Sequence, residues 1–341
     1  MKRSRVLVLA HPTLVPPATM EGRSERDIEE MRTEFDVISV LQQSGHEVRV
    51  LGVLDSLTEL RSSLLHWRPQ VVFNLLEEFN GIVTYDQHVV AFLELMSQPY
   101  TGCNPRGLLL ARDKVLCKQL LHFHRVLTPQ FAVMRRGTRL RVPRGLRWPL
   151  IVKSATEDAS LGIAQASVVD GEDALRERVQ FMHEQIGSDA LVEEYVPGRE
   201  LYVGLLGNER ISRLPVWELH FGSLPANQAP IATRKVKWDL QYQRRHGISS
   251  RRAEELDPAL TDRLDRAARR VYRALHLTGY ARLDFRLRDD GALYLLEANP
   301  NPNLACSEDF AKSALANGME YPALLERIMG LGMNYKAEWR Q

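Results

Sequence analysis

Four side chains near the end of the sequence have types and spacing that could hold a metal ion and stabilise negative charge. They are Arg282, Asp284, Glu297 and Asn299, in the stretch YARLDFRLRDDGALYLLEANPNPNL. Residues 280–287 alternate between apolar and polar types, which is typical of a strand with one buried face. An Asp-Gly pair follows, and it is typical of a two-residue hairpin turn. With that turn, Asp284 faces Glu297 and Arg282 faces Asn299.

Two facing carboxylates repel each other, and they are costly to remove from water unless a cation lies between them. Glu297 follows the apolar run 292–296, where a charged group needs a partner. Mg²⁺ is held by one or two protein carboxylates and completes its shell with water and phosphate oxygens. The pattern therefore predicts that Asp284, Glu297 and Asn299 bind Mg²⁺, with Mn²⁺ as an alternative. The competing interpretation is an ordinary exposed hairpin with solvated acids.

The first third of the chain alternates strand patterns with helix patterns. Apolar runs and helical spacing predict strands at 6–10, 47–53 and 70–76, and helices at 28–41, 57–67 and 83–96. Such alternation is typical of a parallel sheet covered by helices on both faces. Ligands bind at the carboxyl ends of such strands, where Glu77 and Glu78 follow the third strand. These two acids could equally belong to a solvated loop.

The middle of the chain contains a candidate phosphate-binding loop. A helix is expected at 112–124 and strands at 131–134, 148–153 and 163–169. The loop SATEDASLG, which follows Lys153, consists largely of small residues, and small residues let backbone N–H groups approach phosphate oxygens. The Walker pattern GxxxxGK[ST] is absent. Residues 135–147 carry six arginines and no acid, which we interpret as a solvated linker.

The next segments could grip a nucleoside and cover it. After a helix at 173–185, a strand at 190–196 runs into the turn EEYVPGRE. Its backbone edge could meet an adenine, and a carboxylate could accept hydrogen bonds from ribose hydroxyls. A charged connection between strands is the alternative. Strands at 201–206 and 211–219 precede a long polar loop. In it, residues 233–252 hold seven arginines or lysines against one acid. That stretch could be a mobile lid whose active cation is Lys237, or a solvated face. A helix over 260–275 and a final helix starting near residue 321 complete the pattern.

Composition limits the class of protein. A chain of 341 residues is expected to form two or three subdomains, and 44% hydrophobic with 26% charged residues is ordinary for a globular protein. A net charge of +2 gives no argument for nucleic-acid binding. The three cysteines are far apart, so we expect reduced thiols in a cytoplasmic protein. No apolar run approaches the ~20 residues that span a bilayer, and residues 6–10 are better interpreted as a strand than as part of a signal peptide.

These segments together resemble the ATP-grasp superfamily, in its D-alanine–D-alanine ligase-like branch. The resemblance rests on PYTGCNPRGLLLARDK, TPQF, WPLIVKSATEDASLGI, LVEEYVPGRELYVG, KVKWD and ARLDF…LYLLEANPNPNL, in this order and spacing. It implies an ATP-grasp fold of class α/β, with α+β architecture in the ATP-binding part. Three units are expected: an N-terminal parallel α/β domain over 1–105, a central lid subdomain over 106–189, and a C-terminal subdomain with the metal site over 190–341.

The resemblance also implies roles for individual residues. Seven positions match the family's nucleotide-binding residues: Lys114, Lys153, Ser160, Glu193, Glu194, Val196 and Glu200. In the family, the lysines contact phosphates, the residues around Glu193 and Val196 contact adenine, and the last glutamate binds ribose. Lys237 matches a lid lysine that reaches the terminal phosphate. Asp284, Glu297 and Asn299 match ligands of two Mg²⁺ ions, and Arg282 matches an arginine that stabilises the transferring phosphoryl group.

The reaction implied is ATP-dependent joining of a carboxylate to an amine through an acyl phosphate, with release of ADP. The substrates are expected to be amino acids or a peptide, with an acidic second substrate considered because of the basic stretch 233–252. A homodimer is expected from the resemblance. The segment Pro300-Asn301-Pro302-Asn303-Leu304 departs from the Ser-Pro-Gly-Met type of authentic D-alanine–D-alanine ligases, which argues against D-alanine as the substrate. The alternatives are such a ligase with a diverged pocket, an ATP-grasp phosphotransferase, and a non-catalytic nucleotide-binding protein.

Overall fold

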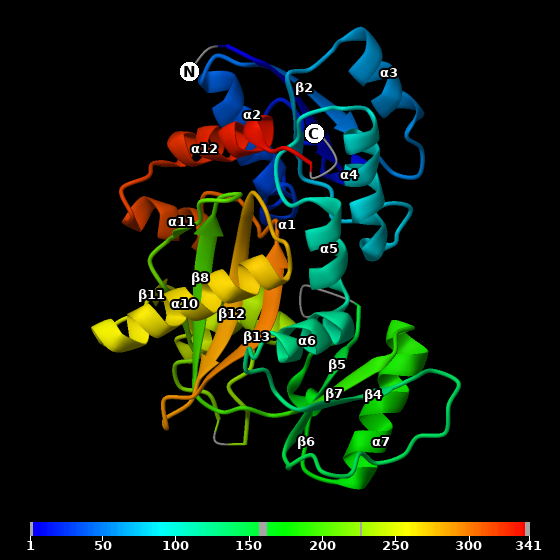
Figure 1. Ribbon diagram of the computed structural model, residues 1–341, viewed down its shortest axis with the longest axis vertical. Coiled ribbons are helices and arrows are strands. Elements are labelled where there is room, and N and C mark those ends of the chain that lie inside the picture. Colours follow the sequence, from blue (N-terminus) through cyan, green and yellow to red (C-terminus); the bar gives the residue numbers. More distant parts are fainter. Residues whose placement is uncertain (1–2, 157–161, 226, 338–341) are drawn as a thin grey trace.

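The computed structural model describes residues 3–156, 162–225 and 227–337. Three β-sheets follow one another along the long axis of the molecule, and helices α5 (Pro105–Arg112) and α6 (Lys114–Phe123) run beside them (Figure 1). No helix in these three stretches is both long and apolar enough to cross a membrane. The α/β class expected from the sequence is confirmed.

The first sheet is parallel, in the order β2-β1-β3. Its strands are β1 (Arg5–Ala10), β2 (Glu47–Gly52) and β3 (Val71–Asn74); its helices are α1 (Glu25–Glu30), α2 (Arg32–Gln43), α3 (Thr58–His66) and α4 (Asp86–Leu95). Alternate residues of β1 enter different cores. Leu7 and Leu9 pack on the side of α3 and α4, whereas Val6 and Val8 pack on the side of α2. Helix α12 (Tyr321–Asn334) joins this second core, so both ends of the chain meet on one domain (Figure 1).

The second sheet is antiparallel, in the order β4-β7-β5-β6. It contains β4 (Phe131–Met134), β5 (Leu150–Ser154), β6 (Val168–Val169) and β7 (Ala190–Glu194), with α7 (Glu172–Phe181) packed on it. The expected strand at 163–169 is wrong over most of its length, because residues Gln165–Ser167 form a 3-10 turn. Strand β7 pairs with β4 and β5, so the third sheet begins after Glu194 rather than at the expected boundary near residue 190.

The third sheet has the path β11-β10-β8-β12-β13 and carries the hairpin of interest. Its strands are β8 (Arg199–Leu206), β9 (Ser212–Arg213), β10 (Trp217–His220), β11 (Ser249–Arg252), β12 (Tyr280–Leu287) and β13 (Leu293–Pro300). Helix α10 (Pro258–Ala274) packs its apolar stripe on β12 through Leu264, Ala268 and Val271. Short helices α8 (Arg234–Trp238) and α9 (Leu240–His246) occupy the region predicted as a loop, and α11 (Asp309–Ala316) precedes α12.

The hairpin pairs the candidate ligands as predicted, although its turn differs from the predicted two-residue turn. Arg282 pairs with Asn299 and Asp284 pairs with Glu297. The turn is one residue longer than predicted, because Leu287 pairs with Leu293 and the Arg288 N–H donates to the Ala292 carbonyl. A bulge after Asp284 absorbs the extra residue, since the next pair joins Phe285 to Leu295. The bulge therefore restores the predicted facing pairs.

Candidate active site

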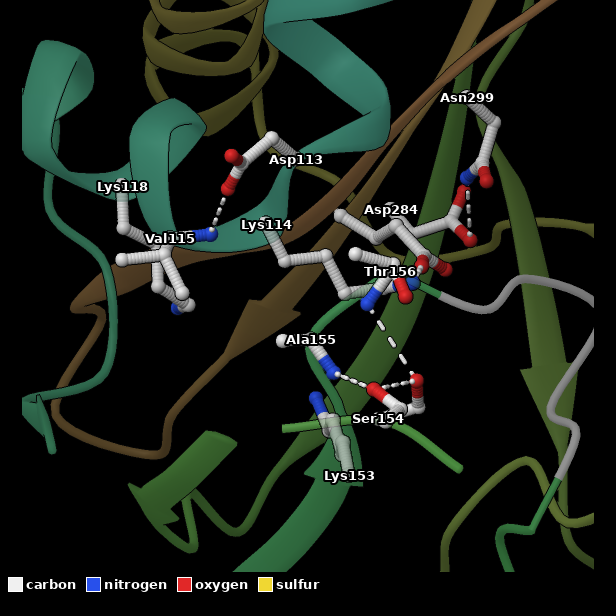
Figure 2. Close-up of polar contacts among 12 residues, drawn as sticks. Asp113, Lys114, Val115, Lys118, Lys153, Ser154, Ala155, Thr156, Asp284 and Asn299 are labelled. Carbon is white, nitrogen blue, oxygen red and sulfur yellow. Dashed lines mark hydrogen bonds and ion pairs between the residues drawn. The ribbon is translucent and has the colours of Figure 1, made fainter. Parts of the chain in front are cut away.

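The polar end of the hairpin is a connected cluster. The Arg282 guanidinium donates to both carboxylate oxygens of Asp284, at 2.8 Å from Nε and 3.0 Å from the terminal nitrogen. Asn299 donates its amide N–H to Asp284 at 3.1 Å, which leaves the amide oxygen to face elsewhere. Lys114, at the start of α6, forms an ion pair of 3.3 Å with Glu297. Figure 2 shows Lys114 reaching from α6 toward Asp284 and Asn299.

Burial and charge act against each other in this cluster. Burial raises the pKa of the Asp284 carboxyl, even though Arg282 and Lys237 act to lower it. Burial also acts to lower the pKa of Arg282, but the facing Asp284 carboxylate outweighs it and raises the pKa overall. The guanidinium also lies over the Tyr202 ring at 4.6 Å, a cation–π contact. Because the nearby cations do not fully offset the cost of burying the Asp284 carboxylate, this carboxylate can still bind a further cation.

Three lysines converge beside the cluster, two of them on one buried carboxylate. Lys118 lies 2.8 Å and Lys153 lies 3.0 Å from the two oxygens of Glu193. Burial acts to raise the pKa of Glu193, but these two ammonium groups prevail and lower it to about 2. The Lys114 backbone N–H donates to the Ala155 carbonyl, which joins the start of α6 to the start of the candidate phosphate loop. This loop continues into residues 157–161, so Ser160 lies outside the described residues.

A cleft between the second and third sheets collects five of the seven predicted nucleotide-binding residues: Lys153, Glu193, Glu194, Val196 and Glu200. Apolar side chains on its walls, Ile151, Ile163, Ile231 and Leu296, leave a slot suited to a planar base. Its polar lining residues are Lys153, Glu193, Glu194, Glu200, Lys237, Asp284, Arg286 and Glu297, and Val196 also lines it. An adjoining hollow is lined by Lys114, Lys118, Lys153, Glu193 and Glu297. The two hollows share Lys153, Glu193 and Glu297 in their walls, so they form one continuous site.

The two other glutamates of the turn segment already have partners. Glu194 pairs with Arg147 at 3.1 Å, and its carboxylate also accepts the Arg147 backbone N–H. Burial acts to raise the pKa of Glu194, but these contacts lower it overall. The Glu194 side chain is therefore held by the arginine-rich segment 135–147, which the sequence predicted to be a solvated linker. Glu200 lies deeper and accepts hydrogen bonds from Arg286 at 2.7 Å and from the Tyr202 hydroxyl at 3.0 Å.

Lys237 enters the cleft from helix α8. Thr233 caps this helix by accepting the Val236 N–H, and Val236 is buried against β8 and β10. The segment just before the cap, Ile231 and Ala232, forms part of the cleft wall. The helix therefore has a fixed base, and Lys237 is close enough to Asp284 to influence the pKa of that carboxyl.

Two residues of the site were missed in the sequence. Lys118 follows Lys114 by one helical turn on α6, a spacing that places both side chains on the same face. That periodicity was the available signal. Arg286 sits two residues after Asp284 in the alternating strand, on the same side of the sheet. No local pattern in the sequence distinguished it from the other polar residues of that face.

Comparisons with known proteins show the family of the chain. Residues 119–330 match the model of the D-ala D-ala ligase C-terminus family. A D-alanine–D-alanine ligase of Nitratidesulfovibrio vulgaris (strain Hildenborough) is 34% identical over 319 residues, which cover 91% of this chain and 95% of that protein. The chain belongs to the D-alanine–D-alanine ligase family. An uncharacterized protein of Sinorhizobium fredii, y4sG, is 33% identical over 87% of this chain and 86% of its own length.

Solved structures with the same fold cover nearly the whole chain. The D-alanine–D-alanine ligase of Bacillus anthracis, solved in complex with ATP, superposes with a TM-score of 0.73 at 21% identity, over 97% of both chains. The VanG D-Ala:D-Ser ligase of Enterococcus faecalis superposes with a TM-score of 0.68 at 17% identity. As a member of the family, the chain is an ATP-dependent carboxylate–amine ligase of the ADP-forming type. Members act on small amino acid substrates and use ATP and Mg²⁺.

The donor set fits Mg²⁺. Asp284 and Glu297 face each other across the hairpin and Asn299 adds an amide oxygen. Within the described stretches, no point gathers three or more His, Cys, Asp or Glu side chains. A site with two carboxylates and one amide is typical of Mg²⁺, which keeps water and phosphate oxygens in the rest of its shell. Softer metals, which prefer imidazole and thiolate, find no such ligands here.

Proposed function

We propose that this ligase joins the carboxylate of one amino acid or peptide to the amine of another, with the site residues in the roles that follow. The observation that carries the proposal is the convergence of Lys114 and Lys153 with Asp284 and Glu297 on one cleft, where Arg282 is bound to Asp284. Such a set of cations suits a phosphoryl transfer in which negative charge accumulates between the two reactants.

In the first step, a substrate carboxylate oxygen attacks the γ-phosphorus of ATP, and the bond from that phosphorus to the bridging oxygen of ADP breaks. Lys114 and Lys153 hold the phosphates, while Glu193 and Val196 hold the adenine. In the second step the amine attacks the acyl phosphate, a C–N bond forms, and phosphate leaves as the amine loses a proton. Lys237 on its lid helix reaches the transferring group and helps to exclude water. Arg282 stabilises the charge in both steps.

We propose two Mg²⁺ ions that share Asp284, Glu297 and Asn299. When bound, the ions neutralise the phosphate charge and orient the γ-phosphoryl group. Ser160 is proposed to contact the phosphates from the loop, Glu194 to act near the adenine, and Glu200 to bind the ribose.

The substrate is proposed to differ from D-alanine. The segment after Asn299 is occupied by its own contacts: Asn301 accepts the Cys103 N–H at 2.8 Å, and Asn303 accepts the Thr33 hydroxyl at 2.7 Å. Asn301 is in a left-handed conformation with φ 52°, and its amide closes onto Gly102. Both asparagine side chains are therefore engaged in contacts with the N-terminal domain. We propose that they give the amino-acid pocket a shape that differs from the pocket of D-alanine–D-alanine ligases.

We also propose a homodimer and a cytoplasmic location. Burial raises the pKa of the Cys103 and Cys117 thiols to about 12, which keeps them protonated and unreactive. Cytoplasm also supplies the ATP that the reaction consumes. Sedimentation velocity of the full chain tests the dimer.

The reaction is tested by measuring ADP release with Mg²⁺ and ATP across amino acids, dipeptides and acidic metabolites, with mass spectrometry of the products. A coupled product lighter by one water than the two substrates, which is lost in Glu297→Gln, supports the proposal. Glu209→Gln, at an exposed turn, is the matched control and keeps activity. A product that carries phosphate but no amide overturns the proposal in favour of a phosphotransferase.

A further inference from the structure

Arg286 is a buried cation that the proposed reaction does not use. Its side chain is 3% exposed, and it lines the nucleotide cleft from strand β12. Its guanidinium binds three acceptors on two segments that are distant in the sequence: the Glu200 carboxylate at 2.7 Å and the Gly198 carbonyl at 2.9 Å in one, and the Pro230 carbonyl at 3.1 Å in the other. A planar group with five N–H donors can make such contacts at once, whereas an ammonium cannot hold the same geometry.

The first of these contacts orients Glu200. One carboxylate oxygen accepts from Arg286 and the other from the Tyr202 hydroxyl. Each carboxylate oxygen has two acceptor positions, so one remains on each for a ligand. The hydrogen bond from Arg286 to the Gly198 carbonyl holds the turn that precedes Glu200. Gly198 has a φ of 130°, and a Cβ added to it would collide with the Leu287 carbonyl, so this turn requires glycine. The carboxylate thus points in one direction only.

The contact with Pro230 reaches the base of the lid. Ala229 is held from the opposite side of the cleft by Gln165, which accepts the Ala229 N–H at 2.9 Å and donates to its carbonyl at 3.1 Å. Four residues after Ala229, Thr233 begins the helix that carries Lys237. The segment 229–232 is therefore held between Gln165 and Arg286.

We propose that Arg286 is a positioning residue that ties Glu200 to the base of the lid, so that ribose recognition and the placement of Lys237 depend on each other. The inference rests on the proposed role of Glu200 as the ribose ligand. Arg286→Lys keeps the positive charge, but one ammonium group cannot bind the Glu200 carboxylate and the carbonyls of Gly198 and Pro230 at once. Glu200 and segment 229–232 are then no longer bound to the same side chain.

The test is calorimetric binding of Mg-ADP and of Mg-2′-deoxy-ADP to the full chain, which requires no turnover. We expect the native chain to prefer ADP by about tenfold, the value of one hydrogen bond to a charged group. In Arg286→Lys this preference falls to about threefold or less. The matched control is Arg269→Lys, which also removes an arginine that pairs with a carboxylate, Asp265, and a backbone carbonyl, but outside the cleft. It keeps the full preference.

A second measurement addresses the lid. At saturating ADP, hydrogen exchange over residues 229–238 slows in the native chain and in Arg269→Lys, and slows less in Arg286→Lys. Circular dichroism verifies that each variant folds; Arg286→Met serves as a second replacement. If Arg286→Lys keeps the native ADP preference and lid protection, the inference is overturned while Glu200 keeps its role. If the native chain itself shows no preference, both the inference and the ribose role of Glu200 are overturned.

Discussion

Replacing Lys118 by Met removes a buried ammonium group while keeping a side chain of similar length. Lys118 is 4% exposed and Glu193 is 1% exposed, and they lie 2.8 Å apart. The variant leaves Glu193 with Lys153 as its remaining cationic partner. Breaking a buried ion pair by removing one member is strongly destabilising, because the other charge stays buried.

The magnitude follows from the pKa of Glu193. A value of about 2, against the ordinary 4.5, corresponds to a preference of about 3 kcal/mol for the ionised form in the folded chain. Because the folded pKa is depressed, this stability is fully present above pH 4.5 and is lost as the pH falls toward 2. Lys118 is the larger of the two lysine contributions, so we expect Lys118→Met to lower the free energy of unfolding by about 2 kcal/mol at pH 7, and by less at pH 3.5.

Urea unfolding followed by circular dichroism measures this loss at both pH values. When Glu193→Gln has already removed the carboxylate, adding Lys118→Met should cost less than it does in the native chain, because the lysine then has no ion pair with residue 193 to lose. Lys336→Met, at an exposed position, is the control and stays within about 0.5 kcal/mol of the native chain. A loss below about 0.5 kcal/mol at pH 7, or an equal loss at pH 3.5, would refute the reasoning.

Three further predictions concern the turn at Gly198, the buried acid Glu34 and Lys114, the lysine proposed to hold phosphate. Gly198→Ala would place a new Cβ against the Leu287 carbonyl, so it should lower the urea midpoint of unfolding. The control is Gly137→Ala, because Gly137 also has a positive φ of 72° but no atom lies within 4 Å of the added Cβ; it should lower the midpoint far less. Equal effects of the two substitutions would contradict the steric explanation. Burial raises the pKa of Glu34 to about 7, so this carboxylate makes the native chain lose stability as the pH rises from 4.5 to 7. Glu34→Gln should therefore raise the free energy of unfolding at pH 8 by roughly 2 kcal/mol, with little change at pH 4; a loss at pH 8 would contradict it. Lys114→Met should reduce kcat/KM for ATP by roughly a hundredfold in an ADP-release assay, and a change under threefold would remove Lys114 from the phosphate site.

The elements with strong periodicity were predictable, and the elements inside polar stretches were not. The apolar strand β1, the alternating strand β12 and the amphipathic helix α10 agree with the patterns in the sequence. Helices α8 and α9 lie in the long polar segment, where few apolar residues mark a face. Their caps, Thr233 and Asp239, accept backbone N–H groups and were the available signal.

The pairing of Asp284 with Glu297 could be obtained from the sequence because strand alternation and a nearby turn are local properties. Even there the turn was one residue longer than predicted, and a bulge compensated for it. Contacts between segments far apart in the chain were decided by the tertiary structure. Lys118 meets Glu193 across 75 positions of sequence, and Arg286 meets Glu200 across 86. Charges of the same type occur throughout the chain, and only the packing of the sheets decides which of them lose their water together and must pair.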